Sequence, residues 1–280
     1  MKKRANPLLI ILRLILTIIL ILVIIVAGYA AYVMIDYHRI DDNQILTPEG
    51  TPKTDVLDVT SGKTYHLTDW NIGFAAYTDQ FSFFMDGGKY SRAFSKDDTI
   101  DTMNSIIDEL LRQDSDFYLI QEVDFGSTRS YKVDEQAMLE DNFGSRFATT
   151  FGVNYDSAYL FYPITSPIGA SKSGLLTMSS ADITESVRRS FPIQTGFAKF
   201  LDLDRCYTVN RIPCSNGHDL VLINLHASAY TTDDTIVRQQ MEMLTGTIQE
   251  EYEKGNYVIA GGDFNMDLLG DSGSIFGVSG

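Results

Sequence analysis

Basic residues are scarce in this 280-residue sequence, which has 22 lysines and arginines against 37 acidic residues. Four of the basic residues lie within the first 13 positions, so the rest of the chain has 18 basic residues against 37 acidic ones and a net charge near −19. A strongly acidic surface repels polyanions and gains little from counterion release. Nucleic acid is therefore disfavoured as a general partner, although a local basic groove remains an alternative.

Cysteine is scarcer still, with only Cys206 and Cys214 in the whole chain. An exported domain can join two cysteines, but the sequence predicts that both lie on one extended segment, eight residues apart. At about 3.3 Å per residue their separation exceeds about 20 Å, whereas a disulfide requires Cα atoms within about 7 Å. We therefore expect free thiols, unless Pro213 starts a tight reversal of the chain.

Charge is nearly absent from one apolar run, residues 8–34, which Arg13 alone interrupts. The 21 residues after Arg13 are long enough to cross the roughly 30 Å hydrocarbon core as a helix. Basic residues precede the run, and Arg39 is the only one just beyond it, so the remainder should face outward. We predict that residues 1–35 anchor a single-pass protein in the cell membrane with an extracellular domain. A signal peptide is the alternative, but its apolar region normally ends at about 15 residues.

The rest of the chain divides into a predicted linker and one predicted domain. Residues 36–62 contain two prolines, two glycines and no sustained periodicity, which is typical of a linker. At 280 residues the chain could hold one large domain or two small ones, and 44% hydrophobic content is ample for a core. We predict that residues 63–280 form one α/β domain.

Three helices are predicted, at residues 95–111, 133–143 and 234–252, and the first and last have one apolar face. The first begins at Ser95, with Asp98 completing a capping box. The last is capped by Asp233 or Asp234 and ends before Gly255.

Strands are predicted at residues 64–72, 117–123, 158–162, 174–179, 196–202, 206–212, 219–226 and 257–260. Adjacent strands with short turns imply an antiparallel region. Strand, helix and strand from residue 219 to 260 form a βαβ unit, whose two parallel strands end at the same edge. The aromatic residues 74–94 are either a long loop over a site or a hairpin with its aromatics in the core.

Four polar residues, Asn71, Glu122, His226 and Asp263, follow the apolar parts of predicted strands. In layered α/β folds, ligands bind at the carboxyl edge of the strands. Each residue has an ordinary structural explanation by itself, such as a structural histidine or a loop charge. Four such residues from distant segments favour a functional site.

The stretch Tyr257 to Asn265 carries the strongest local signal, because a strand runs into Gly261 and Gly262 and then delivers Asp263 and Asn265. Residues two apart in extended chain point to the same side, and glycine lets a ligand or neighbouring backbone approach. A carboxylate and a carboxamide placed in this way suit a metal or a phosphate. A turn after a strand is the alternative.

At these positions the sequence resembles the endonuclease/exonuclease/phosphatase superfamily. The matching stretches follow the family's order over roughly residues 64–269: Asp-Trp-Asn-Ile from 69, Ile-Gln-Glu-Val from 120, Ser-Gly-Leu-Leu-Thr-Met-Ser from 173, Asn-Leu-His from 224 and Gly-Asp-Phe-Asn from 262. The resemblance implies a deoxyribonuclease I-like four-layer sandwich, in which two mixed β-sheets pack between helices. It also implies hydrolysis of phosphate esters with a divalent cation, usually Mg²⁺, with Mn²⁺ or Ca²⁺ as alternatives.

The resemblance also assigns roles to single residues. Glu122 would be the principal metal carboxylate, with Asn71 and Asp263 beside it. Asp263 would orient or deprotonate the attacking water, Asn265 would hold a phosphate oxygen, Asn71 would also contact substrate, and His226 would hydrogen-bond the phosphoryl group. Mg²⁺ prefers oxygen ligands and is often held by one or two carboxylates, which agrees with these residue types.

The sequence lacks one feature that the resemblance implies, a Ser-Asp-His-like segment after Asn265. We therefore expect a domain that is incomplete at its C-terminus. A membrane-anchored phosphoesterase for small phosphoesters or lipid head groups is the main hypothesis. The rival is a weakly active or inactive module that binds anionic lipid head groups or sugars. A metal-free serine hydrolase has little support, since Ser171 and Ser173 lie in no nucleophile turn.

Overall fold

The computed structural model describes residues 7–60, 62–195, 199, 204–229, 234–267, 270 and 274–275. The chain divides into two compact units, residues 1–38 and residues 39–280.

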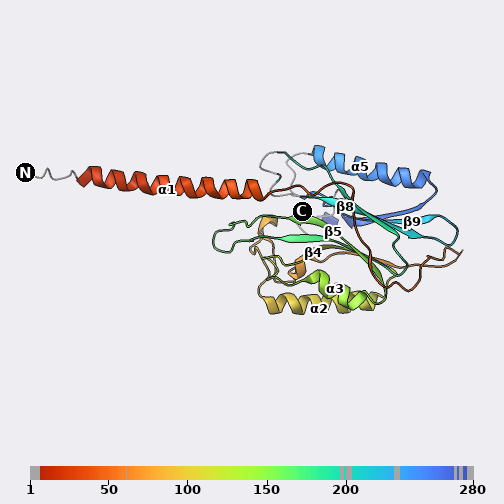
Figure 1. Cartoon of the computed structure of the whole chain (residues 1–280). Helices are drawn as coiled ribbons and strands as arrows, with labels where there is room; N and C mark the ends of the chain where they lie inside the picture. The colour runs from red at the N-terminus through yellow and green to blue at the C-terminus, as the bar shows by residue number, and fades with distance from the viewer. Residues whose placement is uncertain are drawn as a thin grey trace, which may run out of the picture. The chain divides into compact units, whose positions relative to one another are not determined.

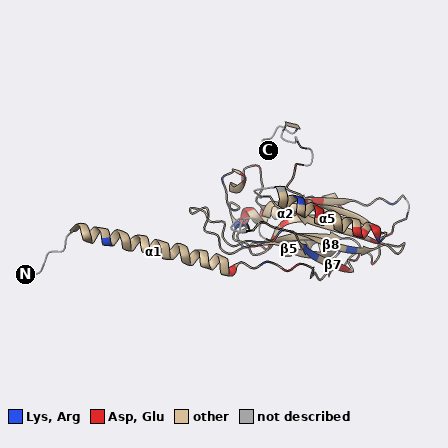
Figure 2. Ribbon diagram, turned by 90° about the horizontal axis from the view of Figure 1, so that it is seen from above, with Lys and Arg blue, Asp and Glu red and all other residues tan. Residues whose placement is uncertain are grey.

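The first unit contains helix α1, Pro7–Asp36, whose own residues are apolar on all of its faces. Arg13 is its only charge before Asp36 at its end (Figure 2). Pro7 suits the first helical position because the N–H that it lacks has no partner within the helix there. An 18-residue window of α1 has a mean hydropathy of 3.4, and the helix is long and apolar enough to cross a membrane. A signal sequence near the N-terminus has the same properties, so the retained anchor stays a prediction.

The second unit contains two mixed five-stranded sheets that face each other (Figure 1). One sheet has the order β1-β7-β8-β9-β10, with bounds Gln44–Ile45, Glu185–Ser190, Cys206–Pro213, Asp219–His226 and Tyr257–Asp263. The other has the order β2-β5-β6-β4-β3, with bounds Glu49–Gly50, Ala148–Asp156, Lys172–Ser179, Phe117–Asp124 and Leu67–Asn71. Strands β9 and β10 are parallel, as are β3 and β4, while the other neighbours are antiparallel.

Helices cover the outer faces of both sheets, with α2 and α3 on one side and α5 on the other (Figure 1). Their bounds are Lys96–Gln113, Glu135–Phe143 and Asp234–Glu253. Side chains along β4 point alternately to the two faces of its sheet, which explains the layers. Tyr118 and Ile120 pack against α2 and α3. Phe117 and Leu119 pack on the opposite face, in a core that includes residues of β8 and β9. The four-layer fold predicted from the sequence is confirmed.

The three helices and the βαβ unit are also confirmed, whereas Asp233, one of the two predicted caps of α5, lies outside the described residues and Asp234 is the first residue of that helix. Ser95 caps α2 by accepting a hydrogen bond from the N–H of Asp98. Strand β9 precedes α5 in the sequence and β10 follows it, and the two strands pair in parallel. Cys206 and Cys214, at the two ends of the extended β8 segment, are buried free thiols.

The segment predicted as a linker, residues 36–62, differs from that prediction. Strand β1 pairs with β7 in one sheet, and β2 pairs with β5 in the other. Leu46 and Leu57 are buried. Two-residue edge strands carry no periodicity, so the sequence pattern gave no sign that this segment completes both sheets.

The observed strands differ from the predicted ones at several places. The structure adds β5 and β7, which the sequence pattern did not predict. The predicted strand at residues 158–162 is wrong, because only Leu160 forms an isolated bridge, with Gly169. The predicted strand at residues 196–202 lies outside the described residues except for Lys199.

Residues 74–94 combine features of both alternatives. They form a loop with two short 3₁₀ turns, η1 at Gly73–Ala75 and η2 at Phe84–Asp86. Phe74, Phe81 and Phe83 are buried in an apolar cluster of their own. This small core gives the loop a fixed shape beside the ends of β3 and β4.

Candidate active site

The carboxyl ends of two parallel strand pairs, one in each sheet, border one cavity of about 400 Å³. All five residues singled out from the sequence line it: Asn71, Glu122, His226, Asp263 and Asn265. The other described residues that line it are Gly73, Tyr77, Phe83, Met85, Asp86, Arg129, Asn154, Tyr155, Ile168, Ser173, Arg205 and Ala229. The strand-end residues therefore converge, although they come from four separate segments.

A bulge in β4 turns Glu122 into the cavity. The pairing of β4 with β6 shifts register between Ile120 and Val123, and Glu122 has a φ of +53°. Left-handed backbone is rare for a residue with a side chain and is found where the surrounding structure imposes it. The bulge leaves Gln121 between the sheets, where it donates to Asp69 Oδ1 at 2.8 Å, while Glu122 lines the cavity.

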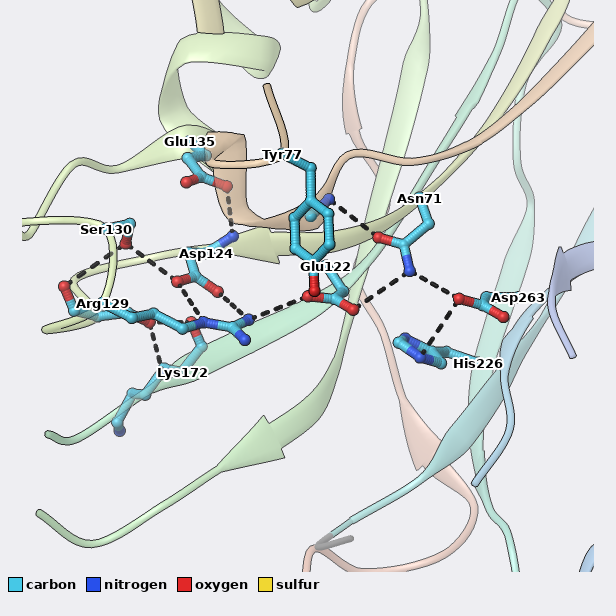
Figure 3. Close-up of polar contacts among 12 residues, drawn as sticks. Asn71, Tyr77, Glu122, Asp124, Arg129, Ser130, Glu135, Lys172, His226 and Asp263 are labelled. Atoms are coloured by element: carbon cyan, nitrogen blue, oxygen red, sulfur yellow. Dashed lines mark hydrogen bonds and ion pairs between the residues drawn. The ribbon is translucent and has the colours of Figure 1, made fainter. Parts of the chain in front are cut away.

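The Asn71 side chain joins the two acidic residues of the site (Figure 3). Its Nδ2 donates to Asp263 Oδ2 at 2.7 Å and to Glu122 Oε1 at 3.2 Å. Its Oδ1 accepts a hydrogen bond from the N–H of Gly73 at 2.9 Å. Because the backbone of Gly73 fixes which way the amide faces, Asn71 presents its NH₂ group to both carboxylates.

The two glycines before Asp263 allow close packing within the protein. The N–H of Gly262 donates to Asp69 Oδ2 at 2.6 Å. A Cβ at Gly262 would lie 2.1 Å from the carbonyl oxygen of Leu225, and one at Gly261 would lie 2.8 Å from Leu119 Cδ1. The close neighbours are thus the adjacent strand and a side chain of the facing sheet, which hold the end of β10 in place.

His226 is buried and neutral. Burial, then the positive charges of Arg205 and Arg129, hold the pKa of His226 well below its usual range. Its Nε2 lies 3.7 Å from Asp263 Oδ2, which is longer than a hydrogen bond, and because the imidazole is neutral the contact is not an ion pair. Among the described residues, Nδ1 has no hydrogen-bond partner. A neutral imidazole with an unpaired nitrogen is suited to hydrogen-bonding a ligand.

Asp263 and Asn265 form a fixed pair after β10. The N–H of Asn265 donates to Asp263 Oδ1 at 2.9 Å, and Asn265 Nδ2 donates to the carbonyl oxygen of Ala227 at 3.0 Å. Asn265 has a φ of +49°, a conformation that Asn tolerates better than most residues. Asp263 therefore keeps both oxygens in defined hydrogen bonds, one from Asn265 and one from Asn71.

A buried charge network contacts Glu122 on the side opposite Asn71 (Figure 3). Arg129 donates to both oxygens of Asp124, at 2.8 and 3.0 Å, and its Nη2 lies 3.5 Å from Glu122 Oε2. Burial lowers the pKa of Arg129, but the charge of Asp124 outweighs burial and the net pKa is raised. The guanidinium also lies 4.0 Å from the centre of the Phe74 ring. Arg129 is therefore a fixed positive charge beside Glu122.

Glu135 adds a second acidic group behind Asp124. Its Oε2 accepts a hydrogen bond from the N–H of Asp124 at 2.9 Å. Burial and the charge of Asp124 raise the pKa of Glu135 well above its usual range. Ser130 Oγ completes the network by donating to Asp124 Oδ2 at 3.0 Å.

The sequence interpretation missed this network because Arg129 lies in a loop without periodicity, where a single arginine resembles a solvated charge. The one signal was Asp124, which follows Glu122 by two residues inside an apolar strand. A buried carboxylate requires a partner. Applied to Asp124, that requirement would have directed attention to a nearby arginine.

The donor atoms fit one hard cation held by two carboxylates. Across the described residues there is no group of three or more His, Cys, Asp or Glu side chains that would hold a metal. Mg²⁺ nevertheless often takes only one or two carboxylates and keeps several waters. Glu122 and Asp263 share the amide of Asn71 and supply such a pair. Asn71 Oδ1 already accepts from Gly73, so Asn71 is placed to orient the carboxylates.

The chain belongs to the endonuclease/exonuclease/phosphatase family, whose model matches residues 70–277. The two mixed sheets between helices agree with the deoxyribonuclease I-like fold of that family. No curated protein sequence matches the chain.

Solved structures with a similar fold have low sequence identity. TDP2 from C. elegans is 14% identical, with a TM-score of 0.47 over 72% of this chain and 48% of that protein. An endonuclease/exonuclease/phosphatase from Beutenbergia cavernae is 17% identical, with a TM-score of 0.45 over 72% of this chain and 47% of that protein. A family protein from Leptotrichia buccalis is 13% identical, with a TM-score of 0.47 over 76% and 71%. The chain spans about half the length of C. elegans TDP2.

Proposed function

We propose that this protein is a metal-dependent hydrolase of phosphate esters. The observation that carries the proposal is the single amide of Asn71 holding Glu122 and Asp263 together beside a neutral, buried His226. Each carboxylate oxygen has two lone pairs, so Glu122 and Asp263 can ligate a hard cation beside the hydrogen bonds that they accept. Carboxylates placed in this way and an imidazole able to hydrogen-bond a phosphate are groups that phosphoester hydrolysis uses.

Each residue has a role in this proposal. Glu122 and Asp263 would hold Mg²⁺, with Mn²⁺ or Ca²⁺ as alternatives, and the bound ion would neutralise charge on the phosphoryl oxygens. Asp263, fixed by Asn71 and Asn265, orients the attacking water and accepts its proton. His226 and Asn265 hydrogen-bond the phosphoryl oxygens as charge builds on them. Positioning and charge stabilisation supply most of the rate in such reactions.

The test is hydrolysis of a phosphoester panel by the purified chain, with Mg²⁺ and with EDTA. We expect Mg²⁺-dependent turnover that Glu122→Gln lowers by at least about 100-fold, the scale of losing one electrostatic contact to a transition state. Glu185→Gln, at an exposed residue of β7, is the matched control. Activity that survives EDTA would contradict the metal role, and Mg²⁺ binding without turnover would favour the binding module.

The substrate class that we favour is a small phosphoester or a lipid head group. The net charge near −19 after the apolar run disfavours long polyanions, and acidic residues occur on both α2 and α5 (Figure 2). A cavity of about 400 Å³ is within the size range of small-molecule pockets. Duplex DNA in the panel provides the comparison, and efficient DNA cleavage at physiological salt without turnover of small phosphoesters would reverse this preference.

We propose that α1 anchors the domain to the outside of the cell membrane. The support is the length and hydropathy of the helix and the basic residues before it. Protease added to intact cells should digest the domain after residue 38. Protection until the membrane is opened would show the opposite orientation, and release of a processed domain into the medium would show a signal peptide.

A further inference from the structure

Two residues that line the cavity, Ser173 and His226, each have a buried side-chain atom, Oγ and Nδ1, without a hydrogen-bond partner among the described residues. Ser173 is only 3% exposed. A buried hydroxyl without a partner destabilises a folded protein. Such an atom in the wall of a cavity is therefore explained most simply by a ligand that supplies the missing hydrogen bond.

Strand pairing fixes the position of Ser173. It lies on β6, with Asp124 of β4 opposite on one side and Tyr155 of β5 opposite on the other. Asp124 accepts hydrogen bonds from Arg129 and Ser130, and Ser173 Oγ donates to no atom of the described residues, Asp124 included. The Ser173 hydroxyl is left as a donor in the cavity wall.

The charge around this part of the wall favours an anion. Arg205 lines the cavity and is 6% exposed. Arg129 also lines the cavity, so two guanidinium groups bring positive charge to its wall. Hydroxyl and guanidinium groups in this wall donate hydrogen bonds, and the oxygens of a phosphoryl group accept them.

We infer that Ser173, Arg205 and His226 form a subsite for phosphoryl oxygens, in which Ser173 is a direct substrate contact. The inference rests on the proposed function, because it names where the substrate's phosphoryl group binds. It assigns Glu122 and Asp263 to the metal side of the cavity and Ser173 to the phosphate side.

Ser171 provides a matched control. Its Oγ is also buried without a partner in the described part of the chain, and Ser171 is 1% exposed. It is not among the residues that line the cavity. The two serines thus share chemistry and burial and differ in access to the ligand.

The experiment uses the full chain in detergent and inorganic phosphate as the probe, without metal. Phosphate should raise the melting temperature of the unaltered chain and of Ser171→Ala. Ser173→Ala should weaken phosphate binding by about tenfold or more, the scale of one hydrogen bond to a charged group. Its melting temperature without phosphate should be unchanged or higher, because an unpaired buried hydroxyl has been removed. If Ser173 had only a structural role, Ser173→Ala would lower the melting temperature without phosphate and leave the phosphate affinity unchanged.

Turnover measurements separate this inference from the proposed function. Ser173→Ala should lower kcat/KM about tenfold on a phosphoester, with Ser171→Ala unchanged. Equal phosphate affinities for the two variants, or no stabilisation of the unaltered chain by phosphate, would overturn the subsite even if turnover depends on Glu122. Selective loss of phosphate binding in Ser173→Ala, in a chain without turnover, would support the subsite and contradict the hydrolase.

Discussion

Nδ2 of Asn71 lies 2.7 Å from Oδ2 of Asp263, although 192 positions separate the two residues in the sequence. Asn71 ends β3 of one sheet and Asp263 ends β10 of the other. Since the same nitrogen also donates to Glu122, one amide holds together two carboxylates that would otherwise repel each other. The site therefore depends on how the two sheets pack.

Asn71→Asp should destabilise the protein when metal is absent. The substitution replaces the shared donor with a third carboxyl group beside two others, and the cost should be on the order of 2–4 kcal/mol. Thermal unfolding measures it, and Mg²⁺ should recover part of the loss by neutralising the added charge. Asn142→Asp, at an exposed residue of α3, is the control. Equal melting temperatures for both variants without Mg²⁺ would contradict this role of Asn71.

Arg129→Met should cost about 3–5 kcal/mol of stability, because it leaves the buried Asp124 carboxylate without its partner. Asp124→Asn together with Arg129→Met should cost clearly less than the sum of the single changes, since the two residues share a bidentate ion pair. Chemical denaturation of the four proteins gives the coupling energy. Simple additivity would show that the pair is not coupled.

Glu251→Gln should lower stability at neutral pH but not in strong acid. Hydrogen bonds from Arg211 at 2.7 and 2.8 Å lower the pKa of Glu251 to about 2. Because the pKa is lowered in the folded state, the carboxylate contributes stability above its unfolded pKa near 4.3 and loses that contribution as pH falls toward about 2.

The expected difference for Glu251→Gln is on the order of 2 kcal/mol at pH 7. Urea unfolding at several values between pH 7 and pH 2 would show this difference in stability disappear as the pH falls. Glu250→Gln, at the exposed neighbouring residue, should show no such trend. A difference that stays constant to pH 2 would rule out the Arg211 ion pair as its cause.

Two truncations should behave differently. A chain that starts at Arg39 keeps the bond from Arg39 to the carbonyl oxygen of Phe191 and both edge strands, so we expect a folded domain with its stability retained. A chain that starts at Lys63 loses buried Leu46 and Leu57, which contribute about 1.5–3 kcal/mol each. It should be less stable by roughly 3–6 kcal/mol. Equal melting temperatures would restore the linker interpretation of residues 36–62.

Part of the site could be predicted because its signals are local. An apolar strand that stops at a polar residue is visible in the sequence at Asn71, Glu122, His226 and Asp263, and the βαβ pattern places the last two at one edge. The capping box at Ser95 and the stop at Gly255, where φ is +86°, depend on residues a few positions apart. Both were correct for that reason.

Other features depend on contacts between distant segments, and these only the tertiary structure decided. β1 and β2 are strands because β7 and β5 present unpaired edges to them. Arg129 is a site residue because the bulge at Glu122 and the carboxylate of Asp124 meet its loop. The sequence alone determined which residue types stand at the strand ends. The packing of two sheets determined which atoms meet, because hydrogen bonds and ion pairs require distances of a few ångströms that local pattern does not encode.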